Sequence, residues 1–332
     1  MKRAFTMIEL VFTMVILSIV AMVATDLIAK TYISYNQTES EHKANLKVEI
    51  ALNSIANRLS YAVGGTVVKR DLDDNNKSIA TTQIAPIEQA PTNYEVLEWI
   101  GYDVDGFNAS EAPLQAGFAL APAWSGFCDV YASNKMAIVT PGSDLDLESN
   151  IIANLSRGNI PSSDKLKNVA LFFPGNYGFD SVGYWNGGHD TSGIAMVDNY
   201  TIPTPTTATF NLKDNPSLPP NTGIARVTEH YKLAWSAYAV VPVNFRKDAT
   251  GNGEDIFDLK LIYNFRPWVG NNNNDYNKYI NTRGHNSLLV TNVTVFKTYA
   301  TENRIHIKLC VKEMFNATKK TSICKERVLL RW

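Results

Sequence analysis

The segment Lys2-Arg3-Ala4-Phe5-Thr6-Met7-Ile8-Glu9, followed by the uncharged run over residues 10–25, decides how the rest of this chain is organised. Two basic residues, a small residue and an aromatic residue precede one acid, Glu9, at the start of an otherwise apolar stretch. A carboxylate in hydrocarbon costs about 2.5–3.5 kcal/mol, so Glu9 needs a partner of opposite charge. If a peptidase cut between Ala4 and Phe5, the new α-amino group would lie one helical turn from Glu9.

These residues resemble the class III leader of type IV pilins and of the pseudopilins of type II secretion systems. The resemblance is specific over residues 2–30 and only architectural afterwards. It implies cleavage by a prepilin peptidase after Ala4, N-methylation of Phe5, and neutralisation of a neighbouring subunit's N-terminus by Glu9 during assembly. It also implies an inner-membrane assembly platform and other pilin-like subunits as partners. Ala4 departs from the family pattern, in which glycine is usual.

The same stretch can also be interpreted as an ordinary secretory signal peptide. It has a basic start and an apolar core, and Ala21-Met22-Val23-Ala24 would serve as a cleavage site. The mature chain would then begin near Thr25, and the product would be a secreted enzyme or binding protein. Against this interpretation, Glu9 interrupts the apolar core, and the helical pattern continues beyond residue 24.

Residues 5–63 contain neither proline nor glycine, and Gly64-Gly65 follows as a helix terminator. We predict one long helix over residues 5–63, of which about residues 5–28 are apolar on every side and span a membrane. Lys2 and Arg3 place the C-terminal bulk outside the cytoplasm. From Lys43 onward, apolar residues recur at near-helical spacing and predict a face that packs on a globular domain. They are Leu46, Ile50, Ile55, Leu59 and Ala62.

The remainder predicts an α+β fold with a long N-terminal helix packed on a β-rich antiparallel domain that carries a large loop-rich insertion. We divide it into a leader (1–4), the helix (5–63), an irregular α+β part (64–225) and an antiparallel sheet (226–332). The alternation of apolar and polar residues over 257–265 and 305–311 indicates half-buried strands. Further expected elements are strands at 94–102, 135–139, 169–173 and 322–332, a hairpin partner at 293–299, a helix from 143 to 155, and long loops over 175–193 and 201–207.

Three cysteines are too few for a metal cluster of the CxxC type. Cys310 and Cys324 lie on either side of a polar turn, and in an oxidising periplasm a bond between them would be worth about 3 kcal/mol. A disulfide-bounded loop near the C-terminus also resembles many pilins. Cys128 is then left over, although it could instead take one of the pair, because connectivity cannot be read from sequence.

The sequence contains few motifs of catalytic or metal-binding sites. It has no HExxH, GxSxG or P-loop motif, and its five histidines are scattered. A net charge of −1 argues against a nucleic-acid partner. We therefore expect that the protein is not an enzyme and that it binds no organic cofactor. A calcium ion is the one ligand that the sequence suggests, because Asp248, Asn252 and Asp255 carry oxygen atoms suited to it. Solvated turns use the same residue types. Residues 74–78 resemble an extended N-glycosylation sequon centred on Asn76.

These features together predict a minor pilin-like subunit, single-pass in the inner membrane with its C-terminal domain in the periplasm, and later part of a filament. Its length of 332 residues exceeds that of a usual repeating subunit, so we expect it at or near the tip, priming assembly. The sequence is consistent with a subunit of a type II secretion filament and with a subunit of a type IV pilus. In a type IV pilus the C-terminal domain would be adhesive. Adhesion predicts that the domain binds surfaces or glycans; a secretion role predicts that deletion blocks export while attachment survives.

Overall fold

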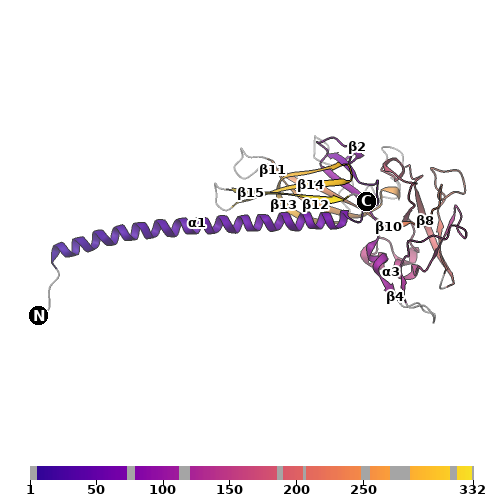
Figure 1. The fold of residues 1–332 in the computed structure, drawn as a ribbon, viewed down its shortest axis with the longest axis horizontal. Coiled ribbons are helices and arrows are strands. Elements are labelled where there is room, and N and C mark those ends of the chain that lie inside the picture. The colour runs from indigo at the N-terminus through magenta and orange to yellow at the C-terminus, as the bar shows by residue number, and fades with distance from the viewer. Residues whose placement is uncertain are drawn as a thin grey trace.

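The computed structural model describes residues 6–72, 79–111, 120–184, 190–204, 207–247, 255–269, 285–314 and 320–330. One helix, α1 (Met7–Leu59), extends far beyond a β-rich body that packs along its second half (Figure 1). Its 53 residues make it about 80 Å long at 1.5 Å per residue. The helix ends at Leu59 with Ser60 as its C-cap, ahead of the glycine pair, in which Gly65 takes a φ of +75° that favours glycine.

An eight-stranded antiparallel sheet lies alongside the second half of α1 (Figure 1). Its strand order is β15-β14-β13-β12-β11-β3-β1-β2, so the strands that follow the helix pair with strands from the end of the chain. The strands are β1 (Val68–Leu72), β2 (Ile79–Pro86), β3 (Val96–Gly101), β11 (Ser236–Lys247), β12 (Asp255–Phe265), β13 (His285–Thr301), β14 (Arg304–Met314) and β15 (Lys320–Leu330).

Residues 102–234, which we call the distal lobe, are inserted between β3 and β11 and lie beyond the C-terminal end of α1 (Figure 1). A five-stranded sheet of order β10-β7-β8-β9-β6 forms their framework. Its strands are β6 (Ala137–Pro141), β7 (Ala170–Phe172), β8 (Ile194–Thr204), β9 (Thr207–Leu212) and β10 (Lys232–Ala234). The other elements are helices α2 (Val104–Asn108) and α3 (Leu145–Leu155), the strand pair β4 (Ser110–Glu111) and β5 (Ala121–Pro122), and 3-10 turns η1 (Ser162–Asp164) and η2 (Phe179–Ser181), with η3 (Pro267–Val269) following β12.

The α+β architecture and the helix-on-sheet arrangement are confirmed, and so is the hairpin of β13 and β14, which closes at the pair Thr301↔Arg304. The expected loop over residues 201–207 is wrong. Residues 201–204 belong to β8 and Thr207 begins β9, and the two strands pair at Thr204↔Thr207, while residues 205 and 206 lie outside the described part of the chain. The register of this pair shifts between Thr201 and Thr204. The threonines suit the strand because they are β-branched.

The face of α1 that packs on the sheet differs from the predicted one. Leu46 and Ile50 are 47% and 61% exposed, although Ile55, Leu59 and Ala62 are buried as expected. The buried positions of α1 follow one stripe that includes small residues: Ala44, Val48, Ala51, Leu52, Ile55, Ala56 and Leu59. Alanines at the contact let the helix approach the sheet closely, and a pattern based on large apolar residues alone overlooks them.

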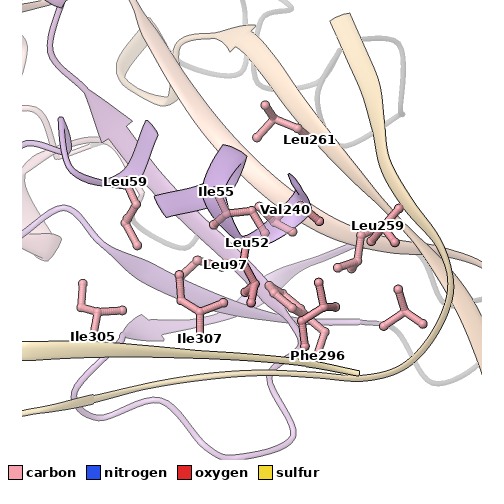
Figure 2. Packing of buried hydrophobic residues seen from close by; sticks show 14 of the residues in the cluster. Leu52, Ile55, Leu59, Leu97, Val240, Leu259, Leu261, Phe296, Ile305 and Ile307 are labelled. Atoms are coloured by element: carbon pink, nitrogen blue, oxygen red, sulfur yellow. The ribbon is translucent and has the colours of Figure 1, made fainter. Parts of the chain in front are cut away.

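The core between α1 and the sheet is built from both ends of the chain. Leu52, Ile55 and Leu59 point from the helix toward Leu97 of β3 and Ile307 of β14 (Figure 2). Ion pairs Lys47–Glu313 and Glu49–Lys325 flank this core and tie the helix to β14 and β15. Both pairs are partly exposed to solvent, where ion pairs contribute little free energy, so their main effect is to fix how the helix lies on the strands.

The last two strands are also joined covalently. Cys310 of β14 and Cys324 of β15 stand opposite each other in the register and form a disulfide. Cys128 is buried in the distal lobe as a free thiol, 3.4 Å from Ser133 Oγ. Of the pairings that the sequence leaves open, the structure thus has the one between the two C-terminal cysteines.

The corrected helix face predicts different costs for two isoleucines one and a half turns apart. Ile55→Ala should lower the free energy of unfolding by about 2–5 kcal/mol, because it opens a cavity under a fully buried side chain. The matched variant Ile50→Ala should stay within about 0.5 kcal/mol of the parent. Denaturant unfolding of the detergent-solubilised chain, followed by tryptophan fluorescence, measures both. Equal losses would contradict the packing described above.

Candidate functional site

The first described residues of the chain form the N-terminal cap of α1. The Thr6 hydroxyl donates to Glu9 Oε2 at 3.2 Å, and the Thr6 backbone N–H lies 3.5 Å from the same oxygen. The Glu9 carboxylate therefore turns back toward the start of the helix, where the partial positive charge of the helix dipole favours it. It is placed to meet a cation at the N-terminal end of the helix.

The first half of α1 lies free of the body. Within the described part of the chain, α1 is the helix long and apolar enough to cross a membrane, and its most apolar window has no buried residue. Met7, Phe12 and Leu17 are among the large apolar side chains exposed there. A contiguous apolar surface of this extent marks a site for lipid or for another protein.

The polar side chains in the apolar half of α1 satisfy their own hydrogen bonds. The hydroxyls of Thr13, Ser18 and Thr25 donate to backbone carbonyls three or four residues earlier, at 2.8–2.9 Å. A hydroxyl bonded in this way can enter hydrocarbon without leaving a donor unpaired. The nearest ion pair along the helix, Lys30–Asp26, comes after this stretch. Glu9 is thus the one charged side chain over residues 6–25.

Comparison with known protein families agrees with this geometry. Residues 1–25 match the prokaryotic N-terminal methylation motif. This motif is the prepilin-type signal of type IV pilins and pseudopilins, so the chain is pilin-like at its N-terminus and carries the segment through which such proteins assemble. Neither the curated proteins nor the solved structures include a significant match to the chain.

The predicted processing residues Ala4 and Phe5 lie outside the described residues, as do Asp248, Asn252 and Asn76. Their roles remain predictions, and so does the assembly role of Glu9. Asp255, the remaining member of the suggested calcium loop, begins β12. Among the described residues, no group of three or more His, Cys, Asp or Glu side chains is arranged to hold a metal ion.

The distal lobe contains two buried carboxyl groups that the sequence analysis did not single out. Asp103 caps α2: its Oδ2 accepts the Gly106 N–H at 2.7 Å, and its Oδ1 accepts the indole N–H of Trp235 at 3.1 Å. Glu148 of α3 is fully buried. A methyl group built on Gly106 would lie 1.9 Å from Glu148 Oε2 and 2.2 Å from Asp103 Oδ2, so the two carboxyl groups converge over this glycine.

The environment of the pair decides where its proton lies. Burial raises the pKa of Glu148 well above the usual range for a glutamate, and the neighbouring Asp103 adds to the rise. Burial also raises the pKa of Asp103, but the N–H donors of Trp235 and Gly106 oppose this effect. Asp103 is therefore the ionised member, and Glu148 is the protonated member that donates to it. This carboxyl pair joins α2 to α3.

A cavity of about 470 Å³ opens beside Asp103, between the last turns of α1 and the start of α2. Tyr61, Tyr102, Tyr238 and Trp235 line it together with Arg58. The Arg58 guanidinium lies 5.4 Å from the centre of the Tyr238 ring, a cation–π distance. Asp103 lines this cavity, and its carboxylate oxygens already accept N–H groups of Gly106, Trp124 and Trp235, so we assign the carboxyl pair a structural role.

The carboxyl pair predicts a pH dependence of stability with a definite sign. A carboxyl group whose pKa is raised on folding stabilises the fold below its ordinary pKa, and this contribution is lost as the pH rises through the folded-state pKa. The loss should approach about 1.4 kcal/mol per pH unit within that window. Glu148→Gln keeps a donor to Asp103 and should remove this part of the decline.

Urea unfolding from mildly acidic to alkaline pH measures the effect, with the exposed Asp164→Asn as the control in the same lobe. Asp164→Asn should follow the parent at every pH. A Glu148→Gln protein that loses stability with rising pH as steeply as the parent would contradict the protonation state assigned here.

Proposed function

We propose that this chain is a minor structural subunit of a type IV pilus or type II secretion filament, held first in the inner membrane and then built into the filament. The match of residues 1–25 to the methylation motif carries this proposal. The free apolar half of α1 supports it, since the same surface that contacts lipid can contact the helices of neighbouring subunits. The disulfide fits a domain that lies in the oxidising periplasm.

Assembly follows from the chemistry of the helix. A prepilin peptidase cuts after Ala4, Phe5 becomes the N-methylated terminus, and the assembly platform draws the helix out of the bilayer. Glu9 then pairs with the amine of a neighbouring subunit, which removes the cost of a carboxylate in an apolar environment. Contacts between apolar helices replace the contacts with lipid.

The size and position of the distal lobe support a place at or near the filament tip, where the subunit primes assembly. The lobe lies beyond the end of α1, in the direction away from the membrane-spanning half (Figure 1). A subunit added above this one would have to accommodate the whole lobe. At the end of the filament no further subunit has to fit above the lobe, and only a few copies of the protein are required.

An adhesive role in a type IV pilus is the second candidate. Phe107, Phe127 and Tyr131 of the distal lobe are exposed aromatic side chains, and Tyr131 is fully accessible. Aromatic residues of this kind supply contact area in binding surfaces. At a filament tip these side chains would be exposed to the surface that the filament contacts.

The mass of the mature N-terminus tests the proposed function. Protein recovered from the membranes of the native cell should begin at Phe5 and carry one additional methyl group. A chain that begins near Thr25 would lack the membrane helix and would overturn the proposal, because the subunit could then neither anchor nor join a filament.

Glu9→Gln tests the proposed assembly step. The variant should insert and be cleaved normally, but its incorporation into filaments should fall by about tenfold, because the amine of the neighbour loses its counter-charge. Glu39→Gln, in the exposed part of the same helix, is the matched control and should assemble like the parent. The amount of each variant in sheared filaments, relative to the membrane pool, is the measurement. Parental incorporation of Glu9→Gln would contradict the step.

A further inference from the structure

The cavity beside Asp103, which we call the junction cavity, lies where the end of α1 meets the distal lobe, far from the half of the helix that can span a membrane (Figure 1). Its volume of about 470 Å³ falls within the range of about 300–1,000 Å³ that sites for small molecules have. Three stretches of the chain line it: residues 54–61, residues 101–105 and residues 235–238. A ligand bound here would therefore contact α1, the sheet and the distal lobe at once.

Polar side chains of the junction cavity have hydrogen-bonding groups that the protein leaves unused. Ser54, Asn57 and Tyr61 follow each other at intervals of three and four residues, so they share one side of the last turns of α1. Within the described part of the chain, their side chains form no hydrogen bond, and neither does the hydroxyl of Tyr102, whose ring centre lies 5.8 Å from that of Tyr61. Hydroxyl and amide groups both donate and accept hydrogen bonds, which matches a ligand whose own groups do both.

The charges around the junction cavity balance each other. Arg58 and Asp105 both line it and are both exposed, and they carry opposite charges. The third charged group, Asp103, already accepts three N–H groups, which compensate its carboxylate. A charged ligand would be attracted by Arg58 or Asp105 and repelled by the other. The cavity therefore suits an uncharged ligand.

The aromatic rings of the junction cavity favour an uncharged ligand as well. The Arg58 guanidinium lies 5.4 Å from the centre of the Tyr238 ring. Lys232 Nζ lies 4.6 Å from the centre of the Tyr102 ring, so the protein's own cations take positions that a cationic ligand would need. Tyr61, by contrast, is 42% exposed. Its ring can stack against a flat apolar face of a ligand.

We propose that the junction cavity binds an uncharged sugar in its pyranose form. The C–H bonds on one side of a pyranose ring form a flat apolar face, which packs on the Tyr61 ring. The hydroxyl groups around the edge of the sugar both donate and accept hydrogen bonds, and so pair with Ser54, Asn57 and the tyrosine hydroxyls. The cavity meets both requirements without any charge on the ligand.

This inference goes beyond the proposed function, because no step of processing or assembly depends on a sugar. It also differs from the adhesive role suggested by the exposed aromatic side chains of the distal lobe, since Phe107, Phe127 and Tyr131 do not line the junction cavity. The N-terminal mass and the binding of a sugar can therefore fail separately.

Saturation-transfer difference NMR of the full chain, in a detergent without a sugar headgroup, tests the proposal. The probes are glucose, galactose, mannose and N-acetylglucosamine, each also as its methyl glycoside. We expect saturation of the C–H protons of at least one of these sugars, with a dissociation constant on the order of 1 mM for a ligand of this size. A methyl glycoside that binds like the free sugar would identify the end of a glycan chain as the ligand, and one that does not bind would identify a free sugar.

Substitutions in the cavity wall sharpen the result. Asn57→Ala removes a donor and an acceptor but leaves the helix intact, because the residue is exposed and alanine favours a helix. Tyr61→Ala removes the stacking ring. Each should weaken binding by about tenfold, whereas Tyr61→Phe keeps the ring and should lose less than about threefold. Tyr131→Ala, fully exposed in the distal lobe, is the control and should bind like the parent.

Charged derivatives of the same sugar test the charge balance. The 6-phosphate should be repelled by Asp105, and the 2-amino derivative should be repelled by Arg58. Each should bind at least about threefold more weakly than the uncharged sugar.

Three outcomes would overturn the proposal. One is that none of the sugars receives saturation at concentrations of about 50 mM. Another is that a charged derivative binds more tightly than the uncharged sugar. The third is that Asn57→Ala and Tyr61→Ala bind like the parent while Tyr131→Ala does not.

Discussion

The structure depends on the continuity of α1, which must serve two different environments without a break. From Met7 to about Thr25 the helix is apolar all round and its hydroxyls bond to its own carbonyls, so it needs nothing from the body. From Ala44 to Leu59 one narrow stripe is buried and the opposite side is exposed. No proline or glycine separates the halves, so the helix runs from one environment to the other without a break.

The sheet that packs on this helix is built from strands that lie far apart in the sequence. β3 comes soon after the helix, and its neighbour β11 comes after the whole distal lobe, so the lobe is an insertion between two adjacent strands. An insertion of this kind leaves the helix-on-sheet core intact, because its ends meet where Gly101 pairs with Ser236. The lobe has its own core around Trp124, Phe210 and Tyr231. It also shares a second buried cluster with the sheet, in which Phe172 and Ile194 pack with Ile100 of β3.

The long helix and the alternating strands were predictable because their signals are local. The sixteen uncharged residues that follow an isolated acid, and the alternation in Ile305, Ile307 and Leu309, can be recognised without knowledge of the tertiary structure. The packed face of α1 was only partly predictable, since Ala44 and Ala51 contact the sheet while the larger Leu46 and Ile50 do not. The carboxyl pair was not predictable, because Asp103 and Glu148 are 45 positions apart and only the fold brings them together.

The parallel course of α1 and the last two strands has a mechanical consequence. If the apolar half of the helix is pulled along its axis, the load reaches the body through the packed stripe and through the ion pairs to β14 and β15. Those strands run along the direction of the force, so they are loaded in shear, and many hydrogen bonds must break together rather than one after another. The disulfide between Cys310 and Cys324 prevents these two strands from sliding past each other. The body is therefore built to resist tension applied through its helix.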